Sequence, residues 1–235
     1  MIKAAIDRIL DLGKADIVTV DDRVYTTKAL HPVEGPSVTT MTIHTLTGIV
    51  DYINDKVDDL EKPLFIHIES ATVVKLYSYL EGQFPRRKEY LSAAFLGETF
   101  KFGRFMDLEP FIIALQSQFV QTDTRAVLLK FVGNVVGENV MTFADDGVSQ
   151  SVAGRVGISS VSEMNVPNPV SLIPYRTFPE VDQPVSEFVF RLKNHDGQPP
   201  QCGLFAADGG YWQNDAIQSI KNWLVDQELK VPIIA

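Results

Sequence analysis

Arg176 is the residue whose type and surroundings most suggest binding chemistry. It lies in the segment Pro174–Pro179, among aromatic residues and with a proline at either end. A guanidinium group held among aromatic side chains can stack on a nucleobase or bind a carboxylate. The alternative interpretation is that Arg176 pairs within the chain, with Glu180 or Asp182.

Two further segments contain groups that could contact an anion. The first is a basic run that consists of Arg86, Arg87 and Lys88. The second is a glycine turn before a predicted helix, where the backbone N–H groups of Gly209 and Gly210 would be accessible. Each segment has a plain structural alternative, because a short basic run is typical of a solvated turn and paired glycines are typical of a strand-to-helix connection.

The sequence contains no recognisable catalytic or metal-ligating pattern. The four histidines are His31, His44, His67 and His195. Their spacing matches none of the motifs in which two histidines bind one metal ion. Cys202 is the only cysteine, so no disulfide can form within the chain, and its apolar neighbours predict a small buried side chain. We therefore expect no catalytic residue, no metal and no cofactor.

The charge of the chain limits its partners. Among 235 residues, 21 are basic and 30 are acidic, which gives a net charge of −9. The acidic residues are spread along the chain, so the surface should repel the phosphates of DNA and RNA. No signal peptide and no run of about 18 apolar residues is found, so no membrane segment is predicted. The expected location is the cytoplasm.

Hydrophobic periodicity and turn residues predict an α+β fold. Helices are predicted over residues 2–12, 45–57, 107–119, 127–135 and 212–228. Strands are predicted over residues 17–20, 23–26, 64–69, 73–80, 88–95, 148–158, 185–192 and 201–207. Short connections between these strands indicate antiparallel sheets, with the helical hairpin and the C-terminal helix packed on one face. We expect a single compact unit over 1–235, with possible subregions at 1–140 and 141–235.

The C-terminal half has features that favour self-association. Seven of the 13 prolines lie between residues 167 and 200, together with many aromatic residues. The last five residues form an apolar tail, which we expect to dock on a sheet or on a partner. Aromatic, proline-stiffened segments are typical of interface cores. The candidate interface residues are Tyr175, Arg176, Phe178, Val231, Ile233 and Ile234.

The layout of the C-terminal half resembles that of phage and prophage proteins of the YfdQ type. The similarity rests on a polar strand at 149–157, the segment Asn168–Phe178, the following hairpin and a terminal helix, and it extends to the helical region that begins near Asp107. It covers about residues 100–235. The resemblance implies a soluble, phage-encoded protein that is not part of the virion, and it implies no catalytic residues.

The sequence thus predicts a non-enzymatic phage or prophage protein that forms a homo-oligomer through its proline- and aromatic-rich half. The alternative is a module that binds or sequesters a host protein or a nucleotide, with the basic run, Arg176 and the glycine turn as anion contacts. An enzyme whose site is assembled across the fold, and a DNA-binding protein, are the weaker hypotheses.

Overall fold

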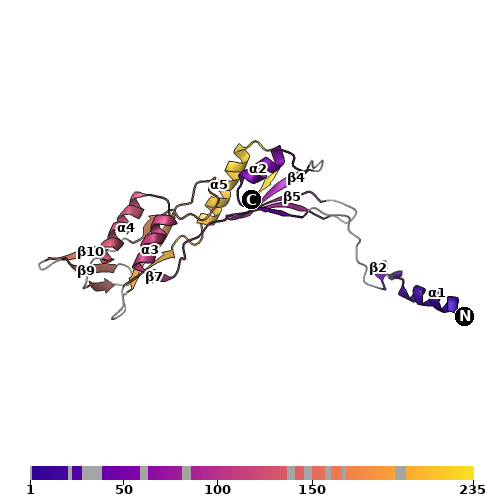
Figure 1. Ribbon diagram of the computed structural model, residues 1–235, viewed down its shortest axis with the longest axis horizontal. Coiled ribbons are helices and arrows are strands. Elements are labelled where there is room, and N and C mark those ends of the chain that lie inside the picture. The colour runs from indigo at the N-terminus through magenta and orange to yellow at the C-terminus, as the bar shows by residue number, and fades with distance from the viewer. Residues whose placement is uncertain are drawn as a thin grey trace. The chain divides into compact units, whose positions relative to one another are not determined.

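The computed structural model describes most of the chain. The described residues are 2–20, 23–27, 39–58, 63–80, 86–136, 141–145, 150–156, 160–165, 168–193 and 200–235. They form helices together with antiparallel and mixed sheets, so the predicted α+β class is confirmed (Figure 1). The contacts divide the chain into two units, Met1–Val38 and Thr39–Ala235, where the sequence predicts one.

The first unit consists of one helix and one hairpin. Helix α1 (Ile2–Gly13) is amphipathic and contains no buried residue. Strands β1 (Ile17–Val20) and β2 (Arg23–Thr26) pair antiparallel, as their sequence predicts. The unit is separate because its apolar side chains do not form a core, and they stay exposed on both the helix and the hairpin.

The second unit contains a five-stranded sheet in the order β14-β4-β5-β6-β3. Its strands are β3 (Met41–Ile43), β4 (Leu64–Ser70), β5 (Val73–Ser78), β6 (Glu89–Ala94) and β14 (Ile233–Ile234). The three central strands form the predicted antiparallel meander. The two outer strands pair parallel with their neighbours, so the sheet is mixed.

Two helices cover one face of this sheet: α2 (Thr47–Asn54) and α5 (Trp212–Asp226) (Figure 1). Alternation along β4 turns Ile66 and Ile68 toward these helices, where they are buried with Ile49, Ile220 and Leu224. We call this cluster the first core. The described residues place no helix on the opposite face, which we call the open face.

The second unit also contains a four-stranded sheet in the order β11-β12-β13-β7. Its strands are β7 (Phe105–Asp107), β11 (Val170–Leu172), β12 (Ser186–Lys193) and β13 (Gln201–Ala206). Helices α3 (Leu108–Ser117) and α4 (Asp123–Val136) form the predicted helical hairpin on this sheet. Their apolar residues, among them Phe111 and Leu128, pack against Phe188 and Phe190 in the second core. The helical hairpin and the C-terminal helix therefore cover different sheets.

A third sheet, in the order β10-β9-β8, completes the second unit. Its strands are β8 (Met141–Asp145), β9 (Gln150–Val156) and β10 (Ser160–Asn165), and both pairings are antiparallel.

The two cores do not follow the predicted boundary at residue 140. The chain between β11 and β12 leaves the second core and inserts Phe178 and Val181 into the first core. The hydroxyl group of Thr177 donates a hydrogen bond to the carbonyl of Ala71, and the rings of Phe95 and Phe178 lie 6.4 Å apart. Residues 1–140 and 141–235 therefore do not form separate subregions, because both cores draw on both parts of the chain.

Candidate functional site

Arg176 is buried between the two cores. Its Nη2 donates a hydrogen bond to Ser186 Oγ and lies 4.0 Å from Asp208 Oδ2. Ser186 Oγ in turn donates to the same carboxylate oxygen. The guanidinium lies over the Trp212 ring, 3.9 Å from its centroid. Arg176 therefore has a counterion, an acceptor and an aromatic face within its own chain.

The charges of this cluster are set by burial and by the pairing itself. Burial lowers the pKa of Arg176 to about 10, against the opposing effect of Asp208, so the guanidinium is still charged at neutral pH. Burial alone would raise the pKa of Asp208. The hydrogen bonds from Ser186 and from the Gly210 N–H, together with the charge of Arg176, outweigh that effect and hold the pKa below its usual value.

The sequence proposed Arg176 and the turn at Gly209 and Gly210 as anion contacts, and the structure brings them together. The anion between them is Asp208, whose Oδ1 accepts a hydrogen bond of 3.0 Å from the Gly210 N–H. The predicted internal pairing of Arg176 is thus present, but its partner is neither Glu180 nor Asp182. Glu180 Oε1 instead accepts hydrogen bonds from the backbone of residues 46 and 47. This cluster is a structural cross-link.

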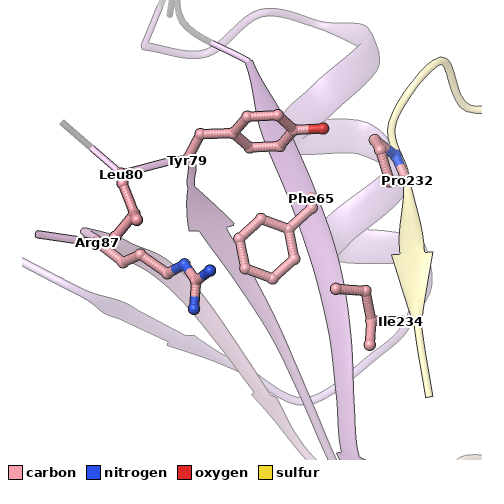
Figure 2. A pocket seen from close by; sticks show the side chains of 6 residues that line it. All are labelled: Phe65, Tyr79, Leu80, Arg87, Pro232 and Ile234. Atoms are coloured by element: carbon pink, nitrogen blue, oxygen red, sulfur yellow. The ribbon is translucent and has the colours of Figure 1, made fainter. Parts of the chain in front are cut away.

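A hollow on the open face is the stronger candidate for a binding site (Figure 2). Its volume is about 400 Å³, within the usual range for small-molecule sites. Its lining residues are Phe65, Tyr79, Leu80, Arg87, Pro232 and Ile234. Two of them were singled out from the sequence: Arg87 as an anion contact and Ile234 as an interface residue. They come from segments that are more than 140 residues apart in the sequence.

Four strands, β4, β5, β6 and β14, position the lining of this hollow. Phe65 lies on β4 and points to the open face, because its neighbour Ile66 points to the first core. Tyr79 follows β5 directly, and Arg87 precedes β6. The wall that contains Ile234 is held to β4 by the hydrogen bond of 2.9 Å from the Ile66 N–H to the Pro232 carbonyl.

Aromatic side chains form a row across the open face. The ring of Phe65 lies 5.6 Å from Tyr77 and 5.9 Å from Tyr79, measured between centroids. The ring of His67 continues the row, 6.3 Å from Tyr77. Figure 2 shows Arg87 and Ile234 on opposite sides of Phe65, with Tyr79 beside it. The hollow therefore has an aromatic floor at the end of this row.

Arg87 is the charged group of the hollow. Its guanidinium carbon lies 5.2 Å from the centroid of the Phe65 ring. The side chain is exposed, and in the described part of the chain it forms no ion pair. A guanidinium group held over a ring keeps its N–H donors available for a carboxylate or a phosphate.

The acidic groups next to the hollow are already paired. Lys75 Nζ lies 2.9 Å from Glu69 Oε2 and 3.6 Å from Glu89 Oε2. Tyr77 donates a hydrogen bond of 3.0 Å to Glu89. Burial and this hydrogen bond raise the pKa of Tyr77, while the hydrogen bond to Glu69 raises the pKa of Lys75. Each carboxylate therefore has a cationic partner other than Arg87.

The remaining interface candidates from the sequence lie outside this hollow, and most of them are buried or half-buried. Phe178 is fully buried, and Val231 and Ile233 are half-buried against the first core. The apolar tail docks on a sheet of its own chain, as β14 on β4. Tyr175 is exposed and lines a second hollow of about 470 Å³, together with His44 and other residues.

The remaining candidates from the sequence are the histidines, Cys202 and the two basic neighbours of Arg87. His31 and His195 lie outside the described residues. Among the described residues, no group of three or more histidine, cysteine or acidic side chains could hold a metal ion. Arg86 and Lys88 are exposed on either side of Arg87. Cys202 is buried in the second core, as its sequence context predicts.

Comparison of the chain with protein-family models, with curated proteins and with solved structures finds no match. None of the helices in the described residues has both the length and the apolar content needed to cross a membrane.

Sequence reasoning missed four lining residues of the hollow: Phe65, Tyr79, Leu80 and Pro232. A signal for the first two exists in the meander, where aromatic residues occupy alternate positions that do not belong to the core stripe. Such a row marks a sheet face that is apolar without being covered. The contribution of Pro232 could not be found this way, because it depends on the parallel pairing of a distant strand.

Proposed function

We propose that this chain is a non-enzymatic protein that assembles into a homo-oligomer through its N-terminal unit. The observation that supports this proposal is that no residue of α1 is buried. The apolar side chains of the helix recur at helical spacing, yet Ile2 and Ile9 are 79% and 67% exposed. Ile6, Leu10 and Leu12 are also exposed. An apolar stripe of this size on a short helix needs a partner surface.

The stability of the isolated unit supports the same proposal. Helices shorter than about 12–15 residues are marginal in water, and α1 has 12 residues. A two-stranded hairpin alone is also marginally stable. The hairpin of β1 and β2 exposes further apolar side chains, among them Ile17, Val24 and Tyr25. Packing against another copy would supply the burial that both elements lack.

The charges of α1 favour a second copy over a membrane surface or a strongly charged partner. Its polar side carries both signs, with Lys3 and Arg8 on the same helix as Asp7 and Asp11. Lys14 forms an ion pair of 2.7 Å with Asp11 within this segment. Helices that lie on anionic membranes have predominantly basic polar faces. A nearly balanced face lets two identical helices approach without net repulsion.

The proposed interface differs from the one expected from the sequence. The proline- and aromatic-rich half was the expected interface, but the side chains of Arg176 and Phe178 are buried within the fold. The exposed apolar surface of the described residues is instead concentrated in residues 2–25. An origin in a phage or prophage, as the YfdQ-type resemblance implies, is part of this proposal and adds no site residue to it.

Light scattering coupled to size-exclusion chromatography tests the proposal on the full chain. We expect the wild type to have the mass of an oligomer, and Ile9→Asp to have the mass of one chain. The matched control is Ala4→Asp, which adds the same charge on the polar side of the helix and should leave the oligomer intact. A monomeric wild type at high micromolar concentration, or equal masses for the two variants, would overturn the proposal.

A further inference from the structure

We propose that the hollow on the open face binds a mononucleotide, with its base against Phe65 and Tyr79 and its phosphate at Arg87. This inference is independent of the proposed self-association, because it concerns the second unit only. It rests on three properties of the hollow: an aromatic floor, an arginine with no ion pair in the described residues, and a size suited to one small molecule.

The aromatic floor favours a planar ligand group. Phe65 is buried beneath the hollow, whereas Tyr79 and Ile234 beside it are about half exposed. Nucleobases stack on exposed aromatic rings such as that of Tyr79, and each stacked base contributes about 1–3 kcal/mol in single-strand binding sites. A planar base placed between Tyr79 and Ile234 would cover side chains that are otherwise in water.

The arginine favours an anionic substituent on that planar group. The Arg87 guanidinium is positioned by the Phe65 ring, so its orientation is partly fixed before any ligand binds. Arginine binds phosphate oxygens through two parallel N–H donors, which is stronger than a single neutral hydrogen bond. Arg86 and Lys88 add positive charge on both sides of it.

The surroundings favour a free nucleotide over a nucleic-acid strand. The neighbouring part of the open face carries two carboxylates, Glu69 and Glu89, which share the cation Lys75, and the whole chain carries a net charge of −9. A strand with many phosphates would be repelled along this path. One phosphate held at Arg87 would lie just before the start of β6. The ligand class is therefore a nucleoside monophosphate.

Isothermal titration of the full chain with AMP, GMP, CMP and UMP tests this inference. We expect at least one of them to bind, and the corresponding nucleoside and inorganic phosphate alone to bind much more weakly. Arg87→Gln should weaken binding about tenfold or more, because a charge-assisted contact is lost. Tyr79→Leu keeps the apolar volume and removes the ring, so it should also weaken binding.

The control variant is Arg104→Gln, which removes an exposed arginine directly before β7 of the four-stranded sheet and should leave affinity unchanged. Thermal melting of each variant establishes that it is folded. Absence of binding by all four nucleotides would overturn the proposal, as would equal affinity of wild type and Arg87→Gln. Binding of a single-stranded oligonucleotide without any mononucleotide would assign the face to nucleic acid. A change of oligomeric mass in Arg87→Gln would assign it to a second copy.

Discussion

The guanidinium of Arg176 stacks on the Trp212 ring at 3.9 Å while Asp208 neutralises its charge from the turn before α5. Arg176 lies between β11 and β12, which belong to the second core, and Trp212 begins α5, which packs in the first core. The contact between the two residues therefore joins the cores. We expect Arg176→Leu to lower the free energy of unfolding by about 2–4 kcal/mol, because it leaves a largely buried carboxylate without its counterion. Urea denaturation measures the loss, and a value within about 0.5 kcal/mol of wild type would contradict it.

Coupling between the two charged residues can be measured separately. A double-mutant cycle of Arg176→Leu with Asp208→Asn should give an interaction energy of about 1–3 kcal/mol. The reason is that each single change removes the partner of the other group. If the two losses simply add, the residues do not act as a pair and the cross-link described above is wrong.

Acid should weaken the cross-link at Asp208. Because the pKa of this carboxyl is lower in the folded state than in the unfolded chain, where it is about 3.9, its contribution is present above about pH 4. That contribution is lost as the pH falls through the folded-state pKa. The stability difference between wild type and Asp208→Asn should therefore shrink below pH 4. Denaturation midpoints at neutral and acidic pH test this, and a pH-independent difference would contradict it.

Glu180 should stabilise α2, although the two are separated by more than one hundred residues in the sequence. Its Oε1 accepts hydrogen bonds of 2.8 and 3.2 Å from the Leu46 and Thr47 N–H groups, at the N-terminus of the helix. We expect Glu180→Ala to lower the free energy of unfolding by about 1–2 kcal/mol. The matched control is Asp182→Ala, an exposed acidic residue nearby, which should change little. Equal effects would show that the carboxylate does not cap the helix.

Cys202 should be unreactive in the native protein. It is buried in the second core, and burial raises the pKa of its thiol, so little nucleophilic thiolate is present. A colourimetric thiol reagent should react slowly with the folded chain and rapidly in concentrated guanidinium chloride. Rapid reaction under native conditions would mean that β13 opens more readily than its packing indicates.

Much of the fold could be predicted because its strongest signals are local. The hairpin of β12 and β13 and the meander of β4 to β6 each join neighbouring strands by short connections, and the alternation of apolar residues fixes their faces. The helix at Asp107 has an N-cap residue type followed by a proline in the first turn. The bounds of these elements are confirmed to within two residues.

What the sequence could not predict depends on contacts between distant segments. Phe119 continues the apolar stripe of α3, yet the helix ends at Ser117 and Phe119 forms a bridge with Pro174. Thr45 has the residue type of an N-cap and accepts a hydrogen bond from Gly48, but nothing local indicates the second contribution from Glu180. The hollow could not be predicted for the same reason, because Arg87 and Ile234 line one hollow only when β14 pairs with β4.

That pairing has a consequence for the order in which the sheet opens. Strand β14 is two residues long and lies at an edge, so its hydrogen bonds should belong to the least protected part of the sheet. Amide hydrogen exchange at Ile66, whose N–H is bound to the Pro232 carbonyl, would report each opening of this edge. A molecule resting against Ile234 would hold the strand in place and slow that exchange. The exchange rate of the Ile66 amide therefore reports whether the hollow is occupied.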